Sequence, residues 1–188
     1  MEFLPVIFAV TAAVLILIGC YVLYVQIIKR KNDAEEAWSD IDVQLKKRYD
    51  LIPNLVTVAK KYMEYEKDVF TEITMLRSQV NVPGKTISID RIQAETKLGG
   101  ALNQLMLRVE NYPDLKADQQ MLRLQRTLVE IEEHIAASRR FYNSAVADFN
   151  NVIKIFPGNL IAASVGVKPI EFFTGGEEIH KVPEVNPK

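Results

Sequence analysis

Few side chains in this chain have the chemistry on which most enzymes depend. The histidines are His134 and His180, and the single cysteine is Cys20. Catalysis usually requires a nucleophile with a base, or a cluster of metal ligands. Cys20 lies inside a long uncharged apolar run, and as the only cysteine it can form no intrachain disulfide. These residues favour a protein that is not an enzyme, and an enzyme with an unrecognised site is the less favoured alternative.

The acidic residues near the histidines lack the spacing of a metal site. Di-iron bundles use a Glu-x-x-His pair on each of two helices and a Glu from each of two others. Ile131 occupies the position three residues before His134, whereas Glu177-x-x-His180 has the right spacing but stands alone. Gly99-Gly100 lacks the Lys-Ser/Thr that follows the glycines of a phosphate-binding loop. We therefore expect neither a metal site nor a bound cofactor.

Acidic and basic residues are nearly equal in number. The chain has 23 Lys and Arg and 24 Asp and Glu, and residues 1–28 contribute only Glu2 to these totals. Nucleic-acid binding requires a clustered excess of positive charge that neutralises phosphates. Because the charges are balanced, we do not expect the protein to bind nucleic acid.

The N-terminal residues form one long apolar segment. Phe3 to Ile28 contains no Asp, Glu, Lys, Arg or His. A helix needs about 20 such residues to cross a hydrocarbon core about 30 Å thick. Residues 1–28 are therefore predicted to form a transmembrane helix. All later segments carry charges at helical spacing, so a single-pass membrane protein is expected.

Two kinds of signal sequence are alternatives for this segment. A cleaved secretory signal has a positive n-region and an apolar core of about 7–15 residues, but here no Lys or Arg precedes a much longer run. Leu17-Ile18-Gly19-Cys20 resembles the site at which bacterial lipoproteins are cleaved and lipidated. Because the apolar run continues to Ile28, a spanning helix is favoured, and a lipoprotein anchored through Cys20 is the alternative.

Positive charge begins directly after the apolar run, at Lys29, Arg30 and Lys31. Short-range positive charge tends to stay on the cytoplasmic side of a membrane. We therefore predict that the N-terminus lies outside and that the rest of the chain is cytoplasmic. The same three residues are candidates for binding anionic lipid headgroups, each charge contributing about 1 kcal/mol, although a role in topology is sufficient to explain them.

After the membrane segment, apolar residues recur at spacings of three and four, which is typical of helices that face a core. The first of these stripes continues from the apolar run without Gly or Pro, and predicts one helix from the bilayer to about Tyr49. That helix should end near Pro53, because proline disturbs a helix interior, and Asp50 can cap the next helix. If the chain turns at Pro53, the bundle has four helices. If Pro53 only kinks a helix, the bundle has three and the first is very long. Four helices are favoured.

Three further helices are expected between turn signals. The second is predicted over the stripe from Leu55 to Val80, the third from Ser88 or Asp90 to Asn111-Tyr112-Pro113-Asp114, and the fourth from Leu124 to Pro157-Gly158. Gly99-Gly100-Ala101 should allow close approach of a neighbouring helix. Short connections make neighbours antiparallel. The prediction is an all-α fold: an up-and-down helical bundle over 29–156, after one N-terminal transmembrane helix, with an extension over 157–188 that is a loose tail from about residue 175.

Some residues are candidates for fixing helix register or contacting a partner. Pro53 and Asn54 lie at the expected break. Asn143 and Asn150 lie a heptad apart on the stripe of Tyr142 and Phe149. Such asparagines indicate register-fixing hydrogen bonds or a partner surface, and simple exposure at the stripe edge is the alternative.

Aromatic and aliphatic residues add further candidates. Trp38 is favoured as a core aromatic residue over a binding anchor. In the extension, Leu160, Ile161, Phe172 and Phe173 are apolar enough to pack on the bundle or on a membrane surface. The basic flank with the segment from Leu160 to Phe173 makes lipid sensing or membrane remodelling an alternative function.

Four ordered blocks resemble the LemA family of bacterial membrane proteins. They are Ala37-Trp-Ser-Asp-Ile-Asp-Val-Gln-Leu-Lys-Lys-Arg-Tyr-Asp-Leu-Ile-Pro-Asn-Leu-Val56, Asn111-Tyr-Pro-Asp-Leu-Lys116, Arg139-Arg-Phe-Tyr-Asn143 and Phe156-Pro-Gly-Asn-Leu-Ile-Ala162. The resemblance covers about residues 24–173. It draws attention to Arg139 and implies an anchored helical bundle without known catalytic activity.

The resemblance also bears on location and partners. It implies the bacterial inner membrane, and it makes an HtpX-like membrane zinc peptidase a possible partner. Family members that resemble lipoproteins have a Tyr-Asn after the cysteine, whereas this chain has Tyr24-Val25. With the single anchor and the long helices, these features favour a scaffold or adaptor that forms homo-oligomers, in part through coiled-coil packing, or holds partners at the membrane.

Overall fold

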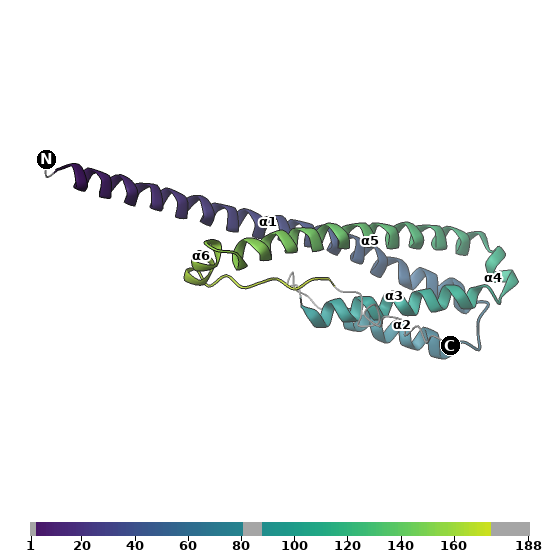
Figure 1. Ribbon diagram of the computed structural model, residues 1–188. Helices are drawn as coiled ribbons and strands as arrows, with labels where there is room; N and C mark the ends of the chain where they lie inside the picture. The colour runs from purple at the N-terminus through teal and green to yellow at the C-terminus, as the bar shows by residue number, and fades with distance from the viewer. Residues whose placement is uncertain (1–2, 81–87, 174–188) are drawn as a thin grey trace, which may run out of the picture. The chain divides into compact units, whose positions relative to one another are not determined.

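A computed structural model describes residues 3–80 and 88–173, and Figure 1 shows its helices. The helices are α1 (Phe3–Lys60), α2 (Lys67–Val80), α3 (Ile89–Val109), α4 (Pro113–Ala117), α5 (Gln119–Lys154) and α6 (Gly158–Ser164). These described residues contain no strand, so the prediction of an all-α bundle with a long N-terminal apolar helix is confirmed.

The described residues form two compact units. Unit 1 takes its residues from 3–39 and 140–172, and unit 2 from 40–139 and 173. The predicted domain limits near residues 28 and 156 stay predictions from composition.

In unit 1, the first part of α1 has the length and composition of a membrane-spanning helix. The most apolar window of α1 is not buried inside the protein. A core helix of a soluble protein would bury these side chains, so their exposure fits contact with lipid. Cys20 lies on this exposed part of the helix.

The later part of α1 within unit 1 packs antiparallel to the end of α5. The Trp38 ring meets the Tyr142 ring edge-on at a centroid distance of 5.6 Å. Ile27 is buried in a small core with Phe149, Ile153 and Ala162 of helices α5 and α6. Trp38 is therefore a core residue of unit 1.

In unit 2, the expected end of a helix near Pro53 is wrong. Pro53 lies inside α1, which continues to Lys60, and Asp50 caps no helix but pairs with Lys46, 3.1 Å away. The chain turns instead at residues 61–66, before α2 begins at Lys67. Unit 2 thus still has four long helical segments, from α1, α2, α3 and α5, although the first break lies later than predicted.

The starts of α3, α4 and α5 follow the sequence signals. Ser88 caps α3, and its side-chain oxygen accepts a hydrogen bond from the Arg91 amide. Pro113 occupies the first turn of α4. Asp118 accepts hydrogen bonds from the amides of Gln120 and Met121 at the start of α5, and these bonds, first among them that of Met121, lower the pKa of its carboxyl group.

Candidate functional site

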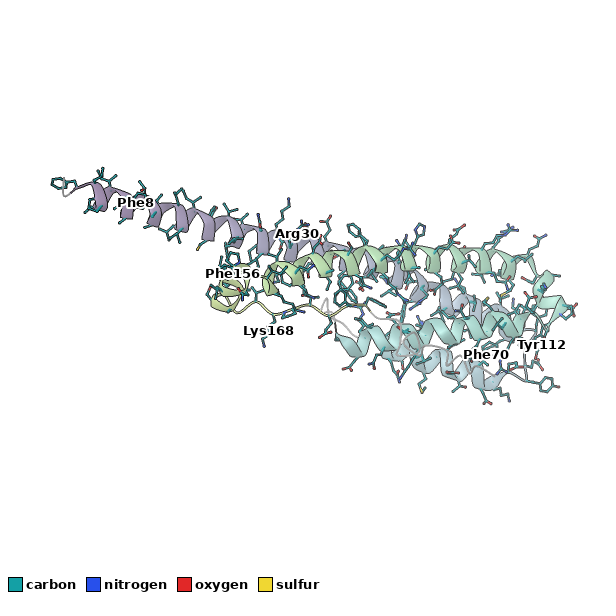
Figure 2. All side chains as sticks on the ribbon, viewed as in Figure 1. Phe8, Arg30, Phe70, Tyr112, Phe156 and Lys168 are labelled. Atoms are coloured by element: carbon teal, nitrogen blue, oxygen red, sulfur yellow. The ribbon has the colours of Figure 1, made fainter. Side chains whose placement is uncertain are left out.

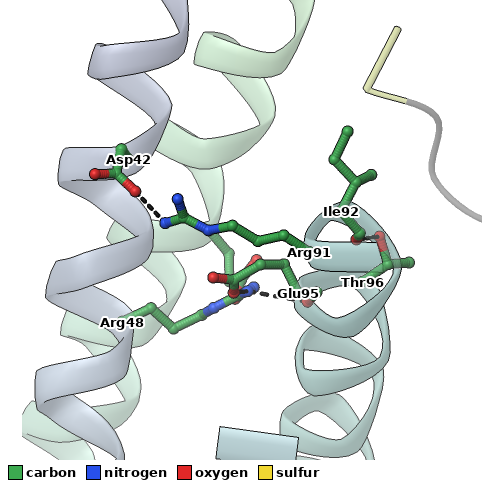
Figure 3. Close-up of polar contacts among 7 residues, drawn as sticks. Asp42, Arg48, Arg91, Ile92, Glu95 and Thr96 are labelled. Carbon is green, nitrogen blue, oxygen red and sulfur yellow. Dashed lines mark hydrogen bonds and ion pairs between the residues drawn. The ribbon is translucent and has the colours of Figure 1, made fainter. Parts of the chain in front are cut away.

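The most unusual group in unit 2 is a guanidinium in the helical core. Arg48 of α1 is fully buried. Its Nη2 donates to the Glu95 carboxylate (2.6 Å) and to the Glu95 carbonyl (3.0 Å), and its Nη1 donates to Glu132 (3.0 Å). Arg48 therefore joins α1 to α3 and α5 inside the bundle (Figure 3 draws the α1–α3 part).

Burial and charge oppose each other at this group. Burial raises the pKa of the Glu95 carboxyl group, and the positive charge of Arg48 partly offsets that rise. Burial also lowers the pKa of Arg139 on α5, and repulsion from the positive charge of Arg48 lowers that pKa further. A charged side chain is tolerated in a core only when its partners compensate for lost hydration, and here Glu95 and Glu132 supply that compensation.

Two nearby features complete the cluster. Arg91, one turn before Glu95 on α3, forms an ion pair with Asp42 of α1 (Figure 3). A Cβ atom at Gly99 would lie 3.1 Å from Nη1 of Arg48. Of the expected close approach at Gly99-Gly100-Ala101, the structure shows the Arg48 side chain of α1 near Gly99, whereas a Cβ atom at Gly100 would meet nothing within 4 Å.

The cluster has the chemistry of a structural network. A guanidinium does not lose its proton in proteins and cannot act as a general base. Within residues 3–80 and 88–173, no group of three or more His, Cys, Asp or Glu side chains is placed to hold a metal ion. His134 is exposed on α5, and Glu177 and His180 lie outside the described residues.

Sequence reasoning missed Arg48 and Glu95, although a signal was present. Arg48 follows Leu45 and precedes Ile52 at the spacing of the first apolar stripe, and Glu95 stands between Ile92 and Leu98 in the same way. Charged residues in apolar phase on two helices are therefore candidates for a buried ion pair.

In unit 1, two predicted residues hold the chain that follows α6. The Asn150 amide accepts a hydrogen bond from the Ile170 N–H (3.0 Å) and donates one to the Ile170 carbonyl (2.9 Å). The Tyr142 hydroxyl donates to the Glu171 carbonyl (2.8 Å), and burial raises the Tyr142 pKa to about 12. Both side chains therefore bind an extended segment of the same chain.

The other predicted register residues have different surroundings. Asn143 is half-buried, whereas Pro53 and Asn54 are exposed on α1 of unit 2. Arg139 lies over the ring of Phe173, with its guanidinium carbon 4.3 Å from the ring centroid. Within unit 1, the structure thus brings Tyr142 and Asn150 together on one segment.

The basic flank is partly engaged within unit 1. Arg30 pairs with Asp148 (3.3 Å) and with Asp33 (3.7 Å), and Lys31 pairs with Glu35 (3.4 Å). All three basic residues are exposed. Such exposed pairs are weak, so they leave the charges accessible to lipid headgroups.

The apolar candidates of the extension fall into two groups. Phe173 is buried and lies under the guanidinium of Arg139, whereas Ile161 is half-buried against the core of unit 1. Leu160 and Phe172 are exposed. Only the latter two are accessible for contacts outside the chain.

Comparison with known proteins identifies relatives over most of the chain. The model of the LemA family matches residues 37–186. Magnetosome protein MamQ 2 of Paramagnetospirillum magneticum is 25% identical over 174 residues, covering 80% of this chain and 64% of that protein. Protein LemA of Metamycoplasma hominis is 24% identical over 164 residues, covering 84% of this chain and 73% of that protein.

The relatives carry different names and cover this chain to different extents. The match spans less than two thirds of the MamQ protein's length, and none of these names is that of an enzyme. The family model covers well over half of the sequence, including the block that holds Arg48 and the block that holds Tyr142. The chain therefore belongs to the LemA family.

Proposed function

We propose that the protein is a membrane-anchored scaffold without catalytic activity, whose bundle binds further copies of itself and other proteins at the membrane. The apolar part of α1 would be the anchor. The names of the family and of its relatives support a role other than catalysis.

The observation that carries this proposal is the apolar surface that unit 2 leaves uncovered. An open groove of about 970 Å³ has the buried Met63 and Phe70 among its lining residues, and it also contains the exposed side chains of Met75 (53%) and Tyr65 (94%). A second hollow of about 510 Å³ between α3 and α5 is lined by residues that include the exposed Val129, the half-buried Met106 and the buried Leu128. Exposed apolar surface around a hollow is typical of protein-binding sites.

The charges around these two surfaces support contact between copies. The first groove, here called the α1–α2 groove, includes Lys60 and Lys67 with Glu64. The second, here called the α3–α5 hollow, includes Glu133 together with Glu110 and Glu132, which pair with Lys116 and Arg48, and its described lining residues include no lysine or arginine. Opposite charge steers two surfaces together. Because the two surfaces differ, the contact would be head-to-tail and would build rings or chains.

Location and orientation are part of the proposal. The basic flank after the apolar run supports an N-terminus outside and a cytoplasmic bundle at the bacterial inner membrane. An HtpX-like peptidase is a candidate partner on family grounds alone. A cysteine introduced at Lys188 in a Cys20→Ser background should resist an impermeant thiol reagent in intact cells; ready labelling would support a lipoprotein facing outward.

Self-association can be tested with two matched valines. Val129 lines the α3–α5 hollow and is 57% exposed, whereas Val43 is 53% exposed on α1 and lines neither surface. Cross-linking in native membranes and mass photometry in detergent should reveal oligomers of the full chain. Val129→Lys should reduce them several-fold, and Val43→Lys should not.

A charge exchange tests the pairing of the two surfaces. Glu133→Lys should weaken self-association, and Lys67→Glu in the same chain should restore it. A full-length protein that stays monomeric and co-purifies with no other protein from gently solubilised membranes would contradict the scaffold proposal.

A further inference from the structure

A short uncharged segment connects the end of α5 to the extended chain of unit 1. No Asp, Glu, Lys, Arg or His lies between Lys154 and Lys168. Residues 155–167 are too few to cross a bilayer, but apolar runs of about 10–14 residues are typical of interfacial or re-entrant segments, as well as of buried core helices. The exposure of its side chains distinguishes these cases.

One side of this segment packs on unit 1 and the other side is uncovered. Ala162 is buried with Ile27 of α1, and Ile161 packs against that core. Gly158 allows α6 to begin directly against α5, since a Cβ atom there would lie 2.0 Å from the Val152 carbonyl oxygen. Large apolar side chains of the same segment are exposed: Ile155, Phe156, Leu160 and Val165.

The helix register places this uncovered side at the depth of the apolar run. In unit 1, Arg30 pairs with Asp148, and Ile27 packs with Phe149 and Ile153. Continuing this antiparallel register brings Phe156 level with about residue 23 of α1. At 1.5 Å per residue, this level is about 8 Å inside the end of the uncharged run at Ile28. Figure 2 likewise shows Phe156 between Phe8 and Arg30 along α1.

Several backbone amides of the segment have the hydrogen-bond partners that contact with lipid requires. Polar backbone groups in hydrocarbon must find partners within the protein. Pro157 has no N–H group to satisfy. The following backbone amides donate hydrogen bonds to carbonyls close by in sequence: Ile155 to Asn151, Asn159 to Ile155, Leu160 to Pro157, Val165 to Ile161, Gly166 to Ala163 and Val167 to Ala162.

We infer that residues 155–167 form a second membrane element, which inserts into the acyl chains beside α1 without crossing the bilayer. Phe156 and Leu160 enter the hydrocarbon edge. Lys154 and Lys168, both exposed, extend their ammonium groups to lipid phosphates, as long basic side chains do at a membrane boundary. The ligand is the lipid of the membrane that α1 crosses.

Spin labels on the full-length chain test this inference. Phe156→Cys and Phe141→Cys are compared in a Cys20→Ser background, after reconstitution into vesicles of phosphatidylethanolamine and phosphatidylglycerol. Both phenylalanines are exposed on the same unit, at 74% and 62%, but Phe141 lies far from the segment along α5. A label on native Cys20 is the reference for a lipid-facing position.

The measurement is collision of the label with oxygen, which concentrates in lipid, and with a water-soluble nickel chelate. At position 156 the ratio of oxygen to nickel collisions should approach that at Cys20 and exceed that at position 141 several-fold. Leu160→Cys should behave like Phe156→Cys, which guards against a local effect of one substitution. A nickel-accessible label, or one that neither reagent reaches because protein covers it, would overturn the inference.

Discussion

The Nε atom of Arg77 donates a hydrogen bond to the carbonyl oxygen of Tyr49, 3.3 Å away. In a regular helix this carbonyl would accept the N–H of residue 53, but Pro53 has none. The Arg77 guanidinium also lies over the Tyr49 ring, its carbon 3.9 Å from the centroid. A side chain of α2 thus supplies the donor that the proline removes, which explains how α1 continues through Pro53.

Replacing Arg77 should therefore destabilise unit 2 through α1. Arg77→Met keeps an unbranched side chain but leaves the Tyr49 carbonyl without its donor, a loss of about 1–3 kcal/mol. Urea unfolding of the full chain in detergent, followed by circular dichroism, measures the change in the free energy of unfolding.

The matched control restores the backbone donor. Pro53→Ala provides an N–H at residue 53, so Arg77→Met should be less harmful in that background. Equal losses with Pro53 and with Ala at this position would show that the hydrogen bond to Tyr49 does not account for the effect.

Removing the buried guanidinium should have a larger effect. Arg48→Met leaves Glu95 buried without its ion-pair partner, which typically costs about 3–5 kcal/mol. Lys47→Met, at the exposed neighbouring position, should change stability by about 0.5 kcal/mol or less. Glu95→Gln added to Arg48→Met should recover part of the loss in the same unfolding measurement, and strict additivity would argue against coupling of the two side chains.

The raised pKa of Glu95 predicts an unusual pH dependence. The folded protein holds a proton on Glu95 at pH values where the unfolded chain, with a pKa near 4.5, has released it. Stability should therefore fall as pH rises from about 4.5 through the raised pKa. Glu95→Gln should lack this slope in unfolding curves recorded across the range. If the wild-type protein instead gains stability relative to the variant over this pH range, the charge of Arg48 lowers the pKa of Glu95 by more than burial raises it.

The amide of Asn150 should protect the backbone of Ile170 from exchange. Asn150→Ala removes both hydrogen bonds to Ile170, and a loss of about 1–2 kcal/mol corresponds to roughly tenfold faster amide exchange. Hydrogen–deuterium exchange with mass spectrometry should detect this in peptides covering 166–173. Asn151→Ala, at the adjacent exposed residue, should leave the exchange rate unchanged.

Features that depend on neighbours in sequence were predictable. The uncharged run, the period of the apolar stripes, the Ser88 cap and the ends of α3 and α5 are local properties. Each of these features depends only on a residue and its immediate neighbours in sequence, because helix periodicity and turn chemistry act over a few residues.

Partners distant in sequence decided the rest. Pro53 stays inside α1 because Arg77, 28 residues after Tyr49 in the chain, supplies the Tyr49 carbonyl with a donor in place of the missing Pro53 N–H. Arg48 is acceptable in a core because Glu95 and Glu132, 47 and 84 residues away, approach it in the folded bundle. The sequence by itself determined a helical chain with one N-terminal apolar helix long enough to span a membrane. Only the tertiary structure decided where α1 ends and which charges are buried, because a hydrogen bond or ion pair compensates for lost hydration only once folding brings its partner into contact.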